Sequence, residues 1–363
     1  MLSRRSLFNM DWSILVVTLV ICAIGVALIY SATAGGSHDG LHKRQALWVA
    51  AGLVLLLIVL TVDYHFWVEF SGYFYLFSIA VLVGVLIFGK TISGARSWIP
   101  LGFFNFQPSE LVKITTALFL ARYCAEIRED GYRFVHLLVT GGIVALPVAL
   151  IALQPDLGTA LTFVPLFAAV NVLAGIRLKT VAILALAGLV MLPVVWHFGL
   201  EDYQKARITT FINPESDPLG AGYQIAQSKI AVGSGALLGK GFMSGTQSQL
   251  KFIPEQHTDF IFSVLAEELG FLGVSFTLGL YFILFSRSVN AARNARDRRG
   301  IFLAMGLVSV LLFHVLVNVG MVIGVMPTTG IPLPLLSYGG SSVISSFIAI
   351  GLILNVRVRR FTN

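Results

Sequence analysis

The chain of 363 residues is too apolar for a soluble domain, because 56% of its residues are hydrophobic, its mean hydropathy is +0.85 and only 12% are charged. These values indicate an integral membrane protein. The net charge of +7 arises from Lys and Arg residues in loops between apolar segments, which is typical of membrane anchoring and not of nucleic-acid binding. Cys22 and Cys124 both lie in apolar segments, so we expect neither a disulfide nor a metal site of cysteine ligands.

Apolar windows long enough to cross about 30 Å of hydrocarbon as helices recur along the chain. They predict an all-α polytopic membrane protein in which residues 1–363 form a single transmembrane domain of ten helices. The first window is longer than the apolar core of a usual signal peptide, so we expect it to be retained. The windows lie near residues 12–30, 46–62, 70–88, 109–124, 137–153, 157–174, 180–198, 260–285, 301–325 and 341–356.

Ten crossings place both chain termini on one side of the membrane. The loops on that side carry most of the Lys and Arg residues, above all in segments 286–300 and 357–360. The positive-inside rule therefore predicts that both termini are cytoplasmic. Segment 286–300 is interpreted as a cytoplasmic anchor, and contact with an anionic membrane lipid is an additional hypothesis for it.

One long extracytoplasmic loop, residues 199–259, is expected between helices seven and eight. It is rich in Gly, Ser and Gln, and a loop of this length without a disordered composition is usually functional. Within it, the apolar residues of 223–232 favour a short amphipathic helix on the membrane surface. The alternative is a linker that only joins the two helices.

Asp259 stands where this loop ends and the eighth predicted helix begins, in the stretch PEQHTDFIFSVLAEELG. With His257 or Thr258 as the cap, it would occupy the first helical turn, where the helix dipole stabilises a negative charge by ~0.3 to 1 kcal/mol. Three apolar residues follow directly, so the carboxylate is also partly desolvated. Desolvation raises its basicity, as a general base requires. These residues alone leave both roles open.

Glu267 and Glu268 follow inside the same predicted helix. On a straight helix they lie about 12 Å deeper than Asp259. We expect them to meet polar partners between helices and not a substrate.

Other polar side chains are predicted at the same outer level as Asp259. The loop after the third helix supplies Arg96 and Trp98, and Glu110 and Lys113 share one face of the fourth helix. Charges inside a membrane helix are costly and usually have a partner. Either these two residues pair with each other, or Lys113 faces an anionic substrate.

Two further motifs fall on the outer side. In QPDLGT, Gln154, Pro155 and Asp156 predict a tight hairpin, with Asp156 as the N-cap of the following helix. In PLPLLSYGGSS, Gly339 and Gly340 precede the last helix, where backbone N–H groups can meet an anion.

The motifs FQPSE, QPDLGT, HTDFIFSVLAEELG and PLPLLSYGGSS, in this order, resemble those of the SEDS family (shape, elongation, division and sporulation) of bacterial inner-membrane proteins. The resemblance covers nearly the whole chain, and four motifs in register are highly specific. ESDPLGAGYQIAQSKIAVGSG, GTQSQL and GIPLPLLSYGG are similar to the RodA, or rod-shape, branch and less so to the FtsW, or division, branch. In GARSW, Ser97 takes the position at which this branch often has Arg, and Arg96 stands one residue earlier.

The resemblance implies a peptidoglycan glycosyltransferase in the bacterial inner (cytoplasmic) membrane, acting during rod-shape elongation. It implies polymerisation of lipid II, an undecaprenyl-pyrophosphate-linked disaccharide pentapeptide, at the outer face. The implied partners are a class B penicillin-binding protein, whose transpeptidase crosslinks the strand, and the rod-complex proteins MreC and MreD. The family's essential aspartate matches Asp259, and its important Trp, Glu and Lys match Trp98, Glu110 and Lys113.

Such a transfer has an α-linked pyrophosphate donor and a β-1,4-linked product, so it inverts the sugar carbon and needs one base. Asp259 would take the proton from the acceptor 4-hydroxyl. Lys113, the loop residues Lys229, Lys240 and Lys251, or a divalent cation (Mg²⁺ or Mn²⁺) would offset the charge of the leaving diphosphate. The sequence contains no dense cluster of metal ligands, so the ion is implied only by the resemblance and by the diphosphate.

Two other functions stay open. A lipid II flippase is expected to have inverted repeats and charges near the membrane midplane. The sequence shows no internal repeat, although Glu267 and Glu268 supply some charge. A scaffold that only holds its penicillin-binding partner would not need acids at the outer boundary of the membrane.

Overall fold

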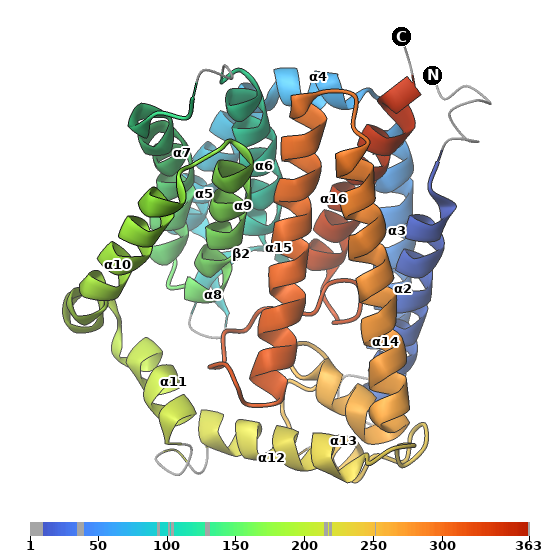
Figure 1. Cartoon of the computed structure of the whole chain (residues 1–363). Helices are drawn as coiled ribbons and strands as arrows, with labels where there is room; N and C mark the ends of the chain where they lie inside the picture. Colours follow the sequence, from blue (N-terminus) through green and yellow to red (C-terminus); the bar gives the residue numbers. More distant parts are fainter. Residues whose placement is uncertain are drawn as a thin grey trace.

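The computed structural model describes residues 10–34, 40–92, 95–100, 102, 105–127, 131–213, 217, 220–250 and 252–361. Within these ranges the chain is mostly helical (Figure 1). The helices are α2 (Trp12–Thr33), α3 (Leu41–Thr61), α4 (Tyr64–Glu69), α5 (Ser71–Phe88), α6 (Pro108–Ala125), α7 (Phe134–Ala152), α8 (Leu157–Leu161), α9 (Phe163–Leu173), α10 (Leu178–Val194), α11 (Asp202–Ile212), α12 (Ala221–Ser234), α13 (Thr246–Gln249), α14 (Ile261–Arg293), α15 (Arg298–Val322) and α16 (Gly340–Val358), with a π-helical turn at Val195–Gly199 and a 3₁₀ turn at Arg359–Phe361.

The helices form a bundle with two distinct ends. At the terminal end, α2 begins and α16 ends, whereas α11, α12 and α13 lie at the opposite end, here called the loop end (Figure 1). In the long connection predicted over residues 199–259, the described residues thus include the three helices α11, α12 and α13. The amphipathic helix predicted over 223–232 corresponds to α12, which buries Ile225, Ser228 and Ala231 and exposes Ile230.

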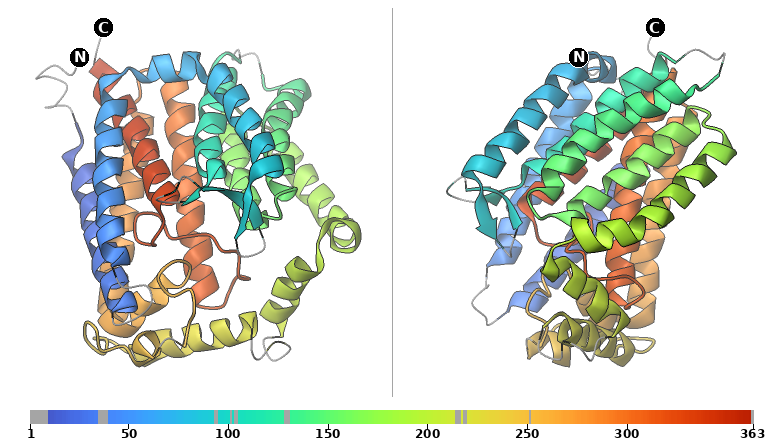
Figure 2. Two further views of the ribbon diagram at one scale, coloured as in Figure 1. Left: turned by 180° about the vertical axis from the view of Figure 1, so that it is seen from behind. Right: turned by 90° about the vertical axis from the view of Figure 1, so that its left-hand side faces the viewer.

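Among the described residues, seven helices are long and apolar enough to cross a membrane: α2, α3, α5, α7, α14, α15 and α16. Two further apolar stretches, Leu157–Leu173 and Lys179–Met191, are shorter. The chain is thus a multi-pass membrane protein. In α16 and α15, 83% and 67% of the apolar window is buried, against 28% in α3 and α5, so α15 and α16 form the centre of the bundle. Helix α10 lies at the edge of the bundle (Figure 2). Its described side chains are mostly exposed.

A small antiparallel sheet corrects the all-α expectation. Strands β1 (Lys90–Ile92), β2 (Ala95–Pro100) and β3 (Asn105–Phe106) lie in the order β1-β2-β3 between α5 and α6 (Figure 2, left). Trp98 pairs with Lys90, and Ile99 pairs with Phe106. Strands this short give no alternation that a sequence window detects. The sheet fixes the position of Trp98 at the loop end.

The α14 helix is broken at Gly270, whose φ of 62° and ψ of −164° are not helical. Before the break, the carbonyls of Glu267 and Glu268 accept hydrogen bonds from the N–H groups of Lys240 and Gly241, both at 3.0 Å. The first segment of α14 therefore stays at the loop end, and only the part after Gly270 runs along the bundle. The expectation that the two acids lie deeper on a straight helix is wrong.

The two acids do meet polar partners, as expected. Glu267 accepts hydrogen bonds from Lys240 Nζ (2.7 Å) and from the N–H groups of Gln247 (2.9 Å) and Ser248 (3.1 Å). Glu268 accepts a hydrogen bond from the Ser31 hydroxyl at the end of α2. These contacts join the α12–α13 connection and α2 to α14.

The break at Gly270 generates a stability prediction. An added Cβ would stand 2.2 Å from the Gly239 nitrogen, and the positive φ disfavours any side chain. Gly270→Ala should therefore destabilise the protein by at least about 2 kcal/mol, measured as a lower Tm in detergent. Gly279→Ala is the matched control in the same helix, because nothing lies within 4 Å of its added Cβ. Equal Tm values for the two variants would contradict the account of the break.

Candidate functional site

A cavity of about 560 Å³ opens at the loop end of the bundle. Its wall comes from β2, the start of α6, the hairpin before α8, α11, the turn before α14, the loop after α15 and the start of α16. Segments far apart in the sequence thus meet around one space. Of the residues singled out in the sequence, the wall contains Trp98, Glu110, Pro155, Asp156, Asp259, Gly339 and Gly340.

Asp259 lies in the turn that precedes α14, half-buried at the cavity wall. The helix begins at Ile261 with Phe260 as its N-cap, so Asp259 is not in the first helical turn and the capping interpretation is wrong. Its backbone carbonyl accepts a hydrogen bond from Asn318 Nδ2 at 2.8 Å. Its carboxylate, however, has no hydrogen-bonding partner in the part of the chain that the structure describes. The carboxylate is therefore free to accept a proton from a bound molecule.

Burial raises the pKa of Asp259 to about 6. The negative charges of Glu255 and Asp156 contribute to this raised pKa, and the positive charge of Arg207 opposes them. The group is thus still ionised at neutral pH, yet it is a stronger base than an exposed aspartate. A carboxylate with this pKa suits general-base chemistry near pH 7.

Asp156 is the N-cap of α8, as its position in QPDLGT predicts. One carboxylate oxygen accepts from the Thr159 N–H (3.1 Å), and the other accepts from the Thr159 hydroxyl (2.9 Å) and from Gln107 Nε2 (2.9 Å). A Cβ on Gly158 would lie 2.2 Å from the Thr329 carbonyl oxygen, so only glycine allows α8 to approach the loop after α15 this closely. This contact closes the cavity wall between the two elements.

Gln154 and Pro155 connect the same hairpin to two different helices, α5 and α11. Gln154 is buried, and its Nε2 donates to the Leu82 carbonyl of α5 at 3.1 Å. The Pro155 carbonyl accepts a hydrogen bond from the Tyr203 hydroxyl of α11. Gln154 therefore has a structural place outside the cavity wall, whereas Pro155 contributes to the wall itself.

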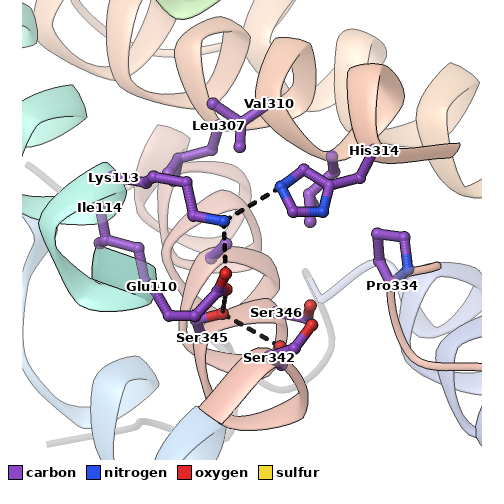
Figure 3. Close-up of a pocket in the computed structure, with 12 residues that line it drawn as sticks. Glu110, Lys113, Ile114, Leu307, Val310, His314, Pro334, Ser342, Ser345 and Ser346 are labelled. Atoms are coloured by element: carbon purple, nitrogen blue, oxygen red, sulfur yellow. Dashed lines mark hydrogen bonds and ion pairs between the residues drawn. The ribbon is translucent and has the colours of Figure 1, made fainter. Parts of the chain in front are cut away.

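Glu110 and Lys113 form an ion pair inside the bundle, with an N–O distance of 2.7 Å (Figure 3). The Ser345 hydroxyl donates to the second oxygen of Glu110 at 2.7 Å, and Lys113 Nζ lies 3.0 Å from His314 Nε2. Glu110, Lys113, His314 and Ser345 all line a small pocket of about 20 Å³. Glu110 and His314 also line the large cavity, but Lys113 does not. Lys113 is therefore separated from the cavity by its two partners, Glu110 and His314.

Comparison with known proteins agrees with the arrangement of these motifs. Residues 7–361 match the FtsW, RodA and SpoVE family, described as cell cycle proteins. The chain belongs to this family. The resemblance found in the sequence motifs is thereby confirmed.

Family members with named activities cover almost the whole chain. The peptidoglycan glycosyltransferase MrdB of Escherichia coli K12 is 38% identical over 358 residues, which span 97% of this chain and 94% of the relative. The peptidoglycan glycosyltransferase RodA of Treponema pallidum is 33% identical, over 98% of this chain and 99% of that protein. A probable peptidoglycan glycosyltransferase FtsW of Trichlorobacter lovleyi is 39% identical over 95% and 92%. Relatives named RodA and FtsW thus match the chain at similar identity.

Solved structures of family members share the fold. A chain of a peptidoglycan synthase complex, solved to describe how polymerization and crosslinking are coordinated, superposes with a TM-score of 0.83 and 32% identity, over 98% of this chain and 99% of that chain. The rod shape determining protein RodA of Thermus thermophilus superposes with a TM-score of 0.73 and 29% identity, over 98% of both chains.

Arg96 and Lys240, which were predicted to contact the substrate, are both hydrogen-bonded to other groups of the protein. The Arg96 guanidinium donates to the carbonyls of Gly89 (2.9 Å) and Ile87 (2.6 Å), so it caps the end of α5. Lys240 is bound to Glu267 and to the Thr246 hydroxyl, both at 2.7 Å. Neither residue lines the cavity, so the structure does not support their predicted contact with a substrate. That contact stays a prediction.

Lys229, another lysine of the long loop, does not line the cavity either. Lys229 packs across Gly324, where an added Cβ would lie 1.9 Å from the lysine Cε. Lys251 falls outside the described residues. The substrate contact predicted for Lys229 likewise stays a prediction.

Arg207 and His314 line the cavity, and the sequence analysis missed both. Arg207 comes from α11, where its guanidinium lies 5.7 Å from the centre of the Tyr203 ring. The capping pattern of Glu201 with Gln204 at the start of α11 was a signal for this helix. His314 and Asn318 stand four apart on α15, so they share one face of an otherwise apolar helix. That spacing was a second signal.

A resident metal site is not evident from the side chains. Within the described ranges, no three or more His, Cys, Asp or Glu side chains form a group that could hold a metal ion. The cavity wall nevertheless carries four carboxylates, those of Glu110, Asp156, Glu255 and Asp259. An ion that brings its own ligands, such as phosphate oxygens, needs only one or two of them.

The buried ion pair generates a prediction about stability. Lys113→Met should leave the Glu110 carboxylate buried without its cation, which destabilises proteins by about 3 to 5 kcal/mol. Thermal melting in detergent should show a large fall in Tm for Lys113→Met. The double variant with Glu110→Gln should recover part of the loss, because it removes the unpaired charge. Equal melting of Lys113→Met and the unaltered protein would contradict the pairing.

Proposed function

We propose that the chain is a peptidoglycan glycosyltransferase that polymerises lipid II into β-1,4 glycan strands during rod-shape cell elongation. The observation that carries this proposal is the Asp259 carboxylate, which lines the cavity of about 560 Å³ and has no hydrogen-bonding partner among the described residues. The relatives whose names record this activity match the chain almost from end to end.

In the proposed reaction, the acceptor 4-hydroxyl oxygen forms a bond to the anomeric carbon of the donor, and the bond from that carbon to the diphosphate breaks. Configuration inverts, so one base on the acceptor suffices and the diphosphate leaves without prior protonation. Asp259 takes the hydroxyl proton. Its pKa of about 6 keeps it ionised at neutral pH and makes it a stronger base than an exposed aspartate.

Arg207 is proposed to meet the leaving diphosphate, because it lines the cavity and a guanidinium forms paired hydrogen bonds with phosphate oxygens. Lys113 acts on the same region indirectly, through Glu110 and His314. Trp98 is proposed as a further substrate contact, since it lines the same wall.

A divalent cation, Mg²⁺ or Mn²⁺, is proposed to enter with the substrate. The charged side chains of the wall are mainly acidic, so a diphosphate needs more positive charge than Arg207 supplies. The carboxylates of Glu255 and Asp156 act electrostatically on Asp259, and they are the residues that would hold such an ion together with phosphate oxygens. The ion supplies charge that stabilises the leaving diphosphate.

For the membrane arrangement, we propose one transmembrane domain of ten crossings in the bacterial inner membrane, with both termini cytoplasmic and α11, α12 and α13 outside. Besides the seven long helices, the crossings are α6, Leu157–Leu173 and Lys179–Met191. The arginines between α14 and α15 and after α16 lie at the terminal end, which fits the positive-inside rule. The cavity then opens at the outer face, where lipid II is used.

The proposed protein partners are a class B penicillin-binding protein and the rod-complex proteins MreC and MreD. Support for the first comes from the similar chain in a peptidoglycan synthase complex that coordinates polymerization with crosslinking. The second pair is proposed from the rod-shape motifs alone. Nucleic acid is not a proposed partner, because the basic residues serve as membrane anchors.

The proposal is tested by removing the base. Asp259→Asn keeps the shape of the side chain and removes its basicity, so polymerisation of purified lipid II in detergent should fall by at least ~10²-fold. The variant should still fold and co-purify with the class B penicillin-binding protein. Melting, co-purification and glycan length on gels are the measurements.

The same assay separates the polymerase from the alternative function, a lipid II flippase. Detergent micelles have no two sides, so a flippase yields no glycan in this assay whether or not residue 259 is altered. The unaltered protein, free of other synthases, must therefore produce polymer with Mg²⁺ or Mn²⁺. If neither ion supports polymer formation, the proposal is wrong. If Asp259→Asn polymerises lipid II at the rate of the unaltered protein, Asp259 is not the base.

The pKa of Asp259 predicts the pH profile. Polymerisation should rise with pH through about 6, because the base acts only when ionised. Glu255→Gln removes a negative charge that raises the pKa, so the acidic limb should move to lower pH. Glu126→Gln, an exposed acid at the terminal end, is the matched control and should leave the limb in place. An acidic limb that Glu255→Gln does not move would contradict the assignment.

A further inference from the structure

The turn that carries Asp259 is held through its backbone. Its three consecutive carbonyls, those of residues 257–259, each accept a hydrogen bond from a segment beyond residue 310. The Tyr338 N–H donates to the first (3.0 Å), the Ser337 hydroxyl to the second (2.6 Å) and the Asn318 side-chain amide to the third (2.8 Å). The turn therefore cannot shift without loss of several hydrogen bonds at once.

The donors are themselves fixed on their far sides. The second amide hydrogen of Asn318 bonds to the Ile331 carbonyl (2.9 Å), and the Ser337 hydroxyl accepts from the Leu333 N–H (2.8 Å). Gln45 of α3 spans the same loop. Its Nε2 donates to the Ser337 carbonyl (2.9 Å), and its Oε1 accepts from the Gly339 N–H (3.2 Å).

We call Gln45, Ser337 and Asn318 the polar frame. All three side chains are buried, with exposed fractions of 0%, 2% and 0%. Gln45 comes from α3, Ser337 from the loop before α16 and Asn318 from α15. Ser337 and Asn318 bond to the Asp259 turn directly, and Gln45 holds the loop that carries Ser337. Each side chain bonds to backbone groups of segments that line the cavity.

Asn318 is not explained by stability alone. Its Oδ1 is buried and has no partner among the described residues, which costs folding free energy. Its two N–H groups, in contrast, link the Asp259 turn to the loop after α15. The contribution of Asn318 thus lies in the position of these two segments.

The position of the turn matters because the Asp259 carboxylate has no bond of its own to the described residues. Where the side chain lies is decided by its backbone and by packing. A displacement of about 1 Å at a reacting group costs up to ~10²-fold in rate. A base without its own hydrogen bonds therefore depends on whatever holds its main chain.

We propose that Asn318, Ser337 and Gln45 are positioning residues that hold the Asp259 turn so that its carboxylate faces the acceptor hydroxyl. This inference rests on the proposed function, in which Asp259 is the base. The frame makes no contact with substrate in this role. It acts only through the backbone of the turn.

The test uses Asn318→Ala and Ser337→Ala in the full chain, assayed with purified lipid II at several pH values. Asn171→Ala on α9 and Ser288→Ala on α14 are matched controls, because both side chains are buried and hydrogen-bonded away from the cavity. Both frame variants should lose at least about 10-fold in kcat, with little change in KM. The controls should lower Tm without a comparable loss of kcat.

The pH profile separates positioning from a general loss of stability. The charged groups that act on Asp259 are Glu255 in its own turn, Asp156 at the start of α8 and Arg207 on α11, and the frame variants change none of them. A loosened turn gives the carboxylate better access to water, so the acidic limb of kcat should move to lower pH. The controls should keep the limb of the unaltered protein.

Folded frame variants with unchanged kcat and an unchanged acidic limb would overturn the proposal. A loss of kcat that follows Tm as closely as in the controls would also overturn it. If Asn318→Ala does not fold, Ser337→Ala decides, because it removes only one oxygen atom. Asp259→Asn in the same assay distinguishes a failure of the positioning role from a failure of the proposed function. If that variant keeps the full rate, the proposed function fails and the frame has no base to position.

Discussion

The Asp259 carboxylate is half-buried at the wall of a large cavity without a hydrogen bond to any described residue. The surrounding structure therefore has to hold this residue through its backbone. An acid in such a place is costly as an anion, which is why burial raises its pKa. Hydrogen bonds to the backbone carbonyls of residues 257–259 hold the turn that carries Asp259. These bonds do not involve the Asp259 side chain, which can therefore accept a proton from a bound molecule. The elements that build the cavity, from β2 to α16, are arranged around this one free group.

Unlike Asp259, Glu110 and Lys113 deeper in the bundle have charged and hydrogen-bonding partners. Glu110, Lys113 and Ser345 form a hydrogen-bonded group with His314, so the charges of Glu110 and Lys113 are paired inside the bundle. Glu110 and His314 also reach the cavity wall, which connects the paired group to the site. The contrast separates roles: paired charges fix the helices that form the wall, and the unpaired acid is left for chemistry.

Much of the fold and of the site was predictable from the sequence. Hydropathy windows overlap the long helices, and the motif residues Trp98, Glu110, Asp156 and Asp259 do converge on one cavity. The break at Gly270 was not predictable, because a glycine inside an apolar run is compatible with a straight helix. Cations of the long loop were assigned to the substrate by charge alone, and which one lines the cavity depends on how that loop folds. Arg207 does so because α11 turns one face toward the hairpin before α8.

The most direct measurement is an experimental structure of the Asp259→Asn variant with lipid II bound at the acceptor position. The account predicts that the acceptor 4-hydroxyl oxygen lies within ~2.6 to 3.2 Å of the side chain at position 259, with the diphosphate of a donor on the Arg207 side of the cavity. An acceptor hydroxyl well beyond hydrogen-bonding reach of position 259, with another carboxylate in contact with it, would contradict the account.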